Sequence, residues 1–216
     1  MKKTNSIAQQ IQNTRLLIDG ALNQPLVSQK LAKFGFPKPE IKKGEAILNR
    51  VVLLDTAKSS KYGQQLRASE QCKEDRVAAW EQYNYHVKSA KLVFRNDWGM
   101  QKQLQLDQPR KRTLAAWLTQ ARYFYQEIQQ MPDHFAKMGV TADELAQTQA
   151  MIEAVSGANH HCKALAGEAQ LATQQRNAAM KELNVWVRRF TKVARVALEE
   201  HDQLLEGLGL MVRSKI

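Results

Sequence analysis

The chain repeats itself with an offset of 104 residues, which limits the folds open to it. Residues 31–36 (LAKFGF) match residues 135–140 (FAKMGV), with identical Ala, Lys and Gly and apolar residues at the other three positions. From residue 32 to residue 71 this offset gives nine identities in forty positions, whereas average composition gives only about two or three by chance. We therefore interpret the chain as two homologous helical repeats, 1–108 and 109–216.

Past residue 71 the best match in the sequence moves to an offset of 106. This register pairs Trp80 with Trp186 and Val87 with Val193. It predicts that two residues were inserted or lost near this point. It also predicts that the two tryptophans are equivalent core residues, because both stand where the rest of the repeat has diverged.

Composition and proline spacing indicate an all-α fold. Only 10 Gly and 5 Pro occur, too few for a turn-rich β structure, and no proline lies within 42–106 or 142–216. Each repeat is predicted to be a shorter helix, 5–33 or 111–137, followed by a long one, and together they form an elongated helical bundle. The candidate core residues of the shorter helices are Ile7, Ile11, Leu16, Ile18, Leu114, Trp117, Leu118 and Phe124.

A glycine is predicted to end the shorter helix of each repeat. Gly35 and Gly139 follow the same Ala-Lys-apolar order, and glycine adopts the left-handed conformation that closes a helix end at little cost. A new helix then starts at once. Pro37 suits a first turn, and Thr141 with Glu144 three residues later has the pattern of a capping box.

The sequence allows two paths for the long stretches, 38–105 and 141–206. Each is either one helix of about 60 residues, on the order of 90 Å long, or two helices that fold back near 59–60 or 156–157. Neither position has the Gly, Pro and Asn cluster of a tight turn. A continuous or kinked helix is therefore favoured.

The second repeat ends in a Trp-x-x-x-Phe helix and a Leu-Leu-x-x-Leu-Gly tail. The residues of this pattern are Trp186, Phe190, Ala194, Ala197, Leu198, Leu204, Leu205, Leu208, Gly209, Leu210, Val212 and Arg213. With them the chain resembles uncharacterised bacterial proteins built from tandem α-helical repeat units. The first repeat keeps Trp80 but departs from the pattern elsewhere. It has Asn84 in place of Phe190 and residues 97–99 in place of 203–205, so it is the degenerate copy. The resemblance implies a duplicated helical fold and no known activity.

No group of residues forms a catalytic or ligand-binding motif. The chain has no Gly-x-Ser-x-Gly, no Gly-x-Gly-x-x-Gly and no Gly-Lys-Ser/Thr segment. His160, His161 and Cys162 are adjacent, but successive helical side chains point about 100° apart, so the three cannot converge on one ion. The charged neighbours of His201 are expected to face different directions on a helix. We predict no catalytic, cofactor-binding or metal-binding residue, no cofactor and no enzymatic activity.

The net charge of +11 makes anionic partners conceivable. The basic runs, 42–43, 110–112 and 188–189, never exceed three residues, whereas nucleic-acid binding needs cationic side chains gathered on phosphates. A solvated basic surface is therefore the preferred interpretation. The alternative is a nucleic-acid-associated protein that binds through surface Lys and Arg.

An aromatic stripe in the first repeat favours protein interaction. Its apolar members are Trp80, Tyr83, Tyr85, Val87, Phe94 and Trp98. Most of the stripe is expected to lie in the core. Aromatic residues that the core cannot cover leave room for a partner groove. We predict a non-enzymatic structural or protein-interaction module, with another protein or a second copy of the chain as its partner.

Cysteine content and the N-terminal residues indicate a cytoplasmic protein. Cys72 and Cys162 are the only cysteines, and they are expected to be reduced and inert. Lys2 and Lys3 resemble the start of a secretory signal, but polar residues interrupt any apolar segment behind them. No stretch has the length and apolar character of a membrane span.

Overall fold

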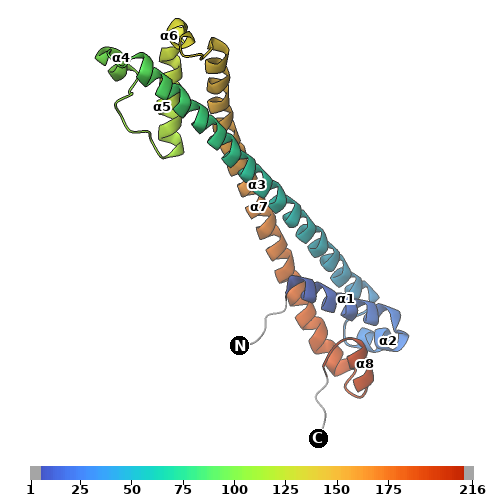
Figure 1. The fold of residues 1–216 in the computed structure, drawn as a ribbon. Coiled ribbons are helices and arrows are strands. Elements are labelled where there is room, and N and C mark those ends of the chain that lie inside the picture. Colours follow the sequence, from blue (N-terminus) through green and yellow to red (C-terminus); the bar gives the residue numbers. More distant parts are fainter. Residues whose placement is uncertain (1–5, 212–216) are drawn as a thin grey trace. The chain divides into compact units, whose positions relative to one another are not determined.

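The structure is a computed structural model, and it describes residues 6–211 except for the side chain of Pro132. Four residues named above, Lys2, Lys3, Val212 and Arg213, lie outside the described residues. Within 6–211 the chain forms helices and no strand (Figure 1). The all-α fold class is therefore confirmed for this part of the chain.

The shorter helix predicted for each repeat is in fact two helices. In chain order the helices of the described residues are α1 (Ile7–Asn23), α2 (Pro25–Lys33), α3 (Lys38–Val93), α4 (Trp98–Gln103), α5 (Leu114–Ile128), α6 (Pro132–Ala136), α7 (Ala142–Ala197) and α8 (Asp202–Gly207). The predicted single helices over 5–33 and 111–137 are wrong because Pro25 and Pro132 each start a new helix. Proline has no backbone N–H to give to a preceding turn, but it fits a first turn well.

The long stretches of both repeats are continuous helices. α3 and α7 each contain 56 residues, so neither folds back near 59–60 or 156–157. The continuous alternative is confirmed for 38–93 and 142–197, but the ends of the predicted stretches, up to 105 and 206, contain the separate short helices α4 and α8. Both segments consist mainly of good helix formers and contain no internal proline beyond the first turn.

The helix bounds keep the 104-residue offset beyond residue 71. α3 and α7 start at residues 38 and 142 and end at residues 93 and 197, and α4 and α8 also start and end 104 residues apart. These bounds do not support the predicted change to an offset of 106, because a two-residue insertion would displace the later ends. At an offset of 104, Trp186 corresponds to Gln82 and Trp80 to Asn184. The equivalence of the two tryptophans stays a prediction.

The turns at Gly35 and Gly139 have the same geometry, as predicted. Their φ angles are 81° and 73°. In both turns the glycine N–H donates to the carbonyl three residues earlier, and the next N–H donates to the carbonyl five residues earlier. These two bonds satisfy carbonyl groups that a helix end leaves without partners.

The predicted capping box at the start of α7 is confirmed. The Thr141 N–H donates to the Glu144 carboxylate at 2.8 Å, and the Glu144 N–H donates to the Thr141 hydroxyl at 3.2 Å. The Thr141 N–H and, at 3.2 Å, the Thr141 hydroxyl both donate to the Glu144 carboxylate, and these bonds hold the pKa of Glu144 below its ordinary value. The charged carboxylate also lies where the helix dipole favours an anion.

Contacts divide the chain into two compact units. The terminal unit combines the chain up to residue 61 with residues from 168 onward, and the middle unit is residues 62–167. α3 and α7 each contribute one part to each unit. The units thus cross the predicted repeat boundary between residues 108 and 109, which stays a prediction about the sequence.

Within the terminal unit α3 and α7 lie side by side and run antiparallel (Figure 1). Arg176 pairs with Asp55 at 3.3 Å, and Lys61 pairs with Glu168 at 2.7 Å. The residue numbers rise along one helix as they fall along the other. α1, α2 and α8 pack on this pair and complete one hydrophobic cluster.

The aromatic centre of the terminal unit is formed by Phe36, Trp186 and Phe190. The rings of Trp186 and Phe190 stack with centroids 5.1 Å apart, and Phe36 meets Phe190 edge to face at 5.5 Å. Phe36 and Phe190 have no exposed surface, and Trp186 is 7% exposed. Of the core residues predicted for α1, Ile18 is buried, but Leu16 is 48% exposed, so its assignment to the core is wrong.

The middle unit has its own hydrophobic cluster, made by α4, α5 and α6 with the remaining parts of α3 and α7. Its largest fully buried side chains are Trp117, Tyr83, Tyr125, Phe124, Phe135, Leu104 and Leu106. Trp117, Leu118 and Phe124 were predicted as core residues and are buried.

No helix among residues 6–211 is both long enough and apolar enough to cross a membrane.

Candidate functional site

A surface groove on the middle unit is the strongest candidate for a binding site. Val77 and Trp80 of α3 form its apolar floor, and Lys73, Arg76 and Arg112 stand around it. Its volume is about 370 Å³, enough for one or two large side chains of a partner. We call it the Val77 groove, and Glu81 completes its lining.

Helical spacing and a stacked indole position the floor of the Val77 groove. Lys73, Val77 and Trp80 follow one another at intervals of four and three residues, so they share one face of α3. The half-buried Trp80 ring lies 5.5 Å from the ring of the fully buried Trp117. The exposed part of the indole is therefore backed by the core and held in place.

The loop between α4 and α5 supplies the opposite wall. The Arg76 guanidinium donates a hydrogen bond to the Arg112 carbonyl at 3.2 Å. This bond ties the loop to α3 beside the groove. The Arg112 side chain is exposed, so its charge is available at the rim.

Arg110 organises the same loop from its inner side. It donates to the Tyr83 hydroxyl at 2.7 Å and to the Gln105 and Gln108 carbonyls at 2.9 Å each. Its guanidinium also lies 5.8 Å from the centre of the Tyr83 ring. The basic run 110–112 therefore has a structural member, Arg110, and a surface member, Arg112.

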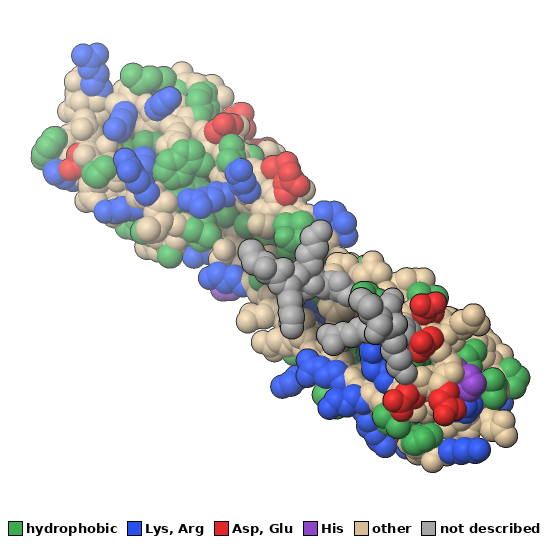
Figure 2. Space-filling model, turned by 90° about the horizontal axis from the view of Figure 1, so that it is seen from below, with side chains coloured by type: hydrophobic (Ala, Val, Ile, Leu, Met, Phe, Trp, Pro, Cys, Tyr) green, Lys and Arg blue, Asp and Glu red, His purple; other side chains and the backbone are tan. Residues whose placement is uncertain are grey.

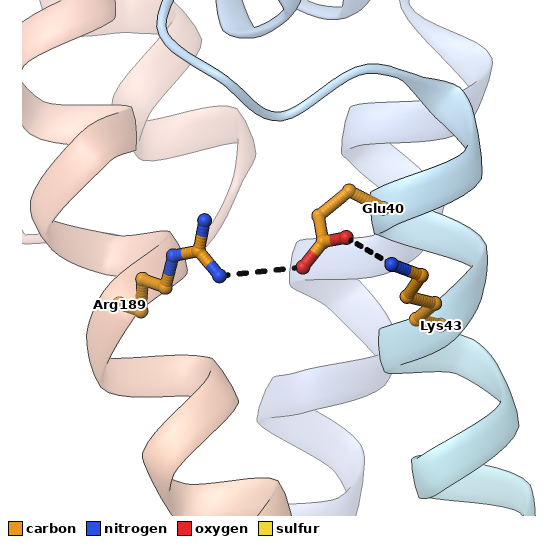
Figure 3. A network of polar contacts seen from close by, with 3 residues as sticks. All are labelled: Glu40, Lys43 and Arg189. Atoms are coloured by element: carbon orange, nitrogen blue, oxygen red, sulfur yellow. Dashed lines mark hydrogen bonds and ion pairs between the residues drawn. The ribbon is translucent and has the colours of Figure 1, made fainter.

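The other two basic runs also have members held by internal contacts. Figure 3 shows Glu40 between Lys43 and Arg189 in the terminal unit, at 2.8 Å and 3.4 Å. The Arg189 guanidinium further lies 5.0 Å from the centre of the Phe36 ring. The hydrogen bond from Lys43 is the main cause that holds the pKa of the Glu40 carboxyl below its ordinary value.

Positive charge is divided unequally between the compact units. The terminal unit has 19 Lys and Arg against 10 Asp and Glu, and the middle unit has 13 against 11. On the face shown in Figure 2, Lys and Arg side chains occupy many separate places among hydrophobic and other side chains. The cationic rim of the Val77 groove thus belongs to the nearly neutral unit.

His86, Tyr125 and Thr148 are buried polar residues in the middle unit. The His86 Nδ1 lies 2.7 Å from the Tyr125 hydroxyl. The Thr148 hydroxyl donates to the Glu144 carbonyl at 2.8 Å. At an offset of 104, Phe190 stands in place of His86.

Burial lowers the pKa of His86 below its ordinary value of 6.5, although the charge of Glu144 acts in the opposite direction. The folded protein therefore favours neutral His86, while the unfolded chain takes up its proton near pH 6.5. Above pH 6.5, His86 does not make the free energy of unfolding depend on pH. We expect the free energy of unfolding to fall as the pH drops below 6.5 towards the lower pKa of the folded state.

Urea unfolding at pH 7.5 and pH 5.5 measures this loss, with His86→Asn as the non-titrating control. The variant is expected to lose less stability between the two pH values than the original protein. Equal losses would show that His86 is not the group responsible.

The residues considered for metal and acid–base chemistry do not form a site. His160, His161 and Cys162 lie in the middle of α7, and no group of three or more His, Cys, Asp or Glu side chains in the described part is arranged to hold a metal ion. Residues 198–200 form a turn after α7 and His201 is the N-cap of α8, so the expectation that His201 lies within a helix is wrong. There the His201 Nε2 is 2.6 Å from the Lys30 ammonium group.

The aromatic stripe predicted in the first repeat divides into core and surface. Tyr83 and Phe94 are buried, whereas Tyr85 is 50% and Trp98 67% exposed. Sequence reasoning included Trp80 but missed Val77, because an isolated valine among charged residues gives no periodic signal. It also missed Arg112 as a rim residue, since the loop conformation brings it to α3.

No family model, no curated protein sequence and no solved structure matches this chain.

Proposed function

We propose that the protein is a non-enzymatic cytoplasmic interaction module that binds an acidic amphipathic segment of a partner protein in the Val77 groove. One observation carries this proposal: an aromatic and aliphatic floor lies among three cationic side chains and one carboxylate, that of Glu81. Tryptophan and arginine are the residue types most often found at the energetic centres of interfaces.

The chemistry of the partner follows from the groove. An apolar side chain fits the floor, because Val77 remains 50% exposed and is open to further burial. Carboxylates beside it would face Lys73, Arg76 and Arg112. The packed position of Trp80 means that little side-chain freedom is lost on binding, which favours affinity.

The test uses two synthetic amphipathic helices with the same leucine face, one flanked by Glu and the other by Lys. We expect the Glu-flanked peptide to bind with a Kd of about 10 μM, measured by fluorescence anisotropy. Val77→Glu is expected to weaken this binding at least about tenfold, because it places a carboxylate on the apolar floor. Arg112→Glu is expected to weaken it to a smaller extent.

Val185→Glu is the matched control, because Val185 is a 62% exposed valine on α7 in the terminal unit. It introduces the same charge at an equally exposed helical position and is expected to leave the Kd unchanged. Preference for the Lys-flanked peptide, or equal effects of the two valine variants, would contradict the proposal.

A labelled single-stranded oligonucleotide in the same assay addresses the nucleic-acid alternative. Arg112 and Arg188 are the charges to reverse, since Arg110 and Arg189 make internal contacts. Submicromolar binding near physiological salt that these reversals abolish would favour the alternative. Counterion release makes any such binding strongly salt-dependent.

We further infer that the two halves of the chain arose by duplication. The equal lengths of α3 and α7, the common offset of 104 residues and the two matching glycine turns support this origin. The polar His86 and the aliphatic Val77 have no like residues at the corresponding positions, Phe190 and Lys181. The groove is then a property that one copy acquired after duplication.

A further inference from the structure

The only two cysteines of the chain lie together in the middle unit. The Cys162 thiol of α7 donates a hydrogen bond to the Ala68 carbonyl of α3 at 3.0 Å. Cys72 is one helical turn after Ala68 on the same face, and helical side chains lean back towards the preceding turn. The two cysteine side chains are therefore neighbours across the α3–α7 pair, and Cys162 acts on the pKa of the Cys72 thiol.

We propose that Cys72 and Cys162 form a dithiol site that a low-molecular-weight disulfide oxidises to an intramolecular disulfide. Both side chains are half-buried and reduced in this structure. They are thus close to each other and still open to a small reagent. Residues so far apart in the sequence meet only because α3 and α7 pair antiparallel.

The reaction balances without any further oxidant. One cysteine loses its proton, and its thiolate attacks the reagent to give a mixed disulfide and one free small thiol. The second cysteine, also as a thiolate, then displaces the other half of the reagent. One S–S bond forms in the protein, one S–S bond breaks in the reagent, and the two protons pass to the two small thiols.

The surroundings of Cys72 set the rate of this reaction. Burial raises the pKa of the Cys72 thiol above its ordinary value, and the neighbouring Cys162 raises it further. Little thiolate is therefore present at neutral pH. Disulfide formation is expected to be slow at pH 7 and to accelerate by up to about tenfold per pH unit while the thiols remain mostly protonated.

The disulfide would fasten α3 to α7 and close a loop that contains α4, α5 and α6. Cross-linking so long a loop restricts the unfolded chain much more than the folded one. We therefore expect the oxidised protein to melt about 10 °C higher than the reduced protein.

The experiment uses the whole chain in buffers of reduced and oxidised glutathione. Intact mass, with a loss of about 2 Da on disulfide formation, and peptide mapping identify the product. We expect the Cys72–Cys162 disulfide in a monomer, with a formation constant about 10² to 10³ times larger in native buffer than in urea. Melting curves of both forms are recorded in parallel.

A relocated pair is the matched control. Cys72→Ser combined with Ser69→Cys keeps two cysteines but moves one thiol to an exposed position on α3. Oxidation of this variant is expected to stop at glutathione adducts or to give dimers. Its disulfide formation constant is expected to be no larger in native buffer than in urea. The proposal would be overturned by two other products on the original protein, a stable glutathione adduct or an intermolecular disulfide. It would also be overturned if the formation constant in native buffer were no larger than in urea, or if the oxidised protein melted at a lower temperature than the reduced protein.

Discussion

Replacing Trp186 with alanine is expected to cost about 3–5 kcal/mol of the free energy of unfolding. The indole is stacked on Phe190, meets Phe36 edge to face and covers the Gly44 backbone of α3. Its removal leaves a cavity that three rigid neighbours cannot fill. Urea denaturation followed by circular dichroism measures the loss.

Trp80→Ala is the comparison for this prediction. Its indole is only half-buried and borders the Val77 groove, so we expect a smaller loss, about 1–2 kcal/mol. Equal losses at the two positions would contradict the 104-residue register and favour the equivalence that the sequence suggested. Trp186→Phe, which keeps a stacked ring, is expected to lie between these results.

Replacing Gly44 with alanine is expected to destabilise the protein although it removes a glycine from a helix. A Cβ at this position would lie 2.6 Å from Cη2 of the Trp186 ring and nearer still to Cζ2 and Cε2. The ring is held by Phe36 and Phe190, so it cannot move aside cheaply. The overlap costs about 2–3 kcal/mol and outweighs the helix-propensity gain of about 1 kcal/mol.

Gly157→Ala is the matched control in α7. A Cβ there meets no atom within 4 Å, so only the propensity gain remains and we expect stabilisation of about 0.5–1 kcal/mol. The double variant Gly44→Ala/Trp186→Ala should be less damaging than the sum of its parts, because the cavity left by the indole accepts the new methyl group. Additive losses, or a stabilising Gly44→Ala, would refute the close contact.

Local features of the fold were readable from residues near one another in the sequence. The glycine turns and the Thr141–Glu144 capping box depend on hydrogen bonds that span no more than five residues. The continuity of α3 and α7 depends on helix propensity and on the absence of breakers. In contrast, the breaks before Pro25 and Pro132 were missed although proline signals them.

Past residue 71 the sequence register follows tryptophan identity, whereas the helix bounds keep an offset of 104. In the structure the buried residues Ala79, Ala90 and Phe94 correspond at an offset of 104 to the buried residues Leu183, Ala194 and Leu198. Residue type drifts at such positions while burial persists.

The sequence by itself determined an all-helical chain, where its long helices begin and how their preceding turns close, because these properties depend on local backbone preferences and hydrogen bonds. Only the tertiary structure decided which segments share a compact unit, how the Val77 groove is assembled and that Cys72 meets Cys162. Each of these depends on the antiparallel pairing of α3 with α7 or on the loop that carries Arg112 to α3. Such contacts join residues far apart in the chain, and helical periodicity alone does not specify which faces meet.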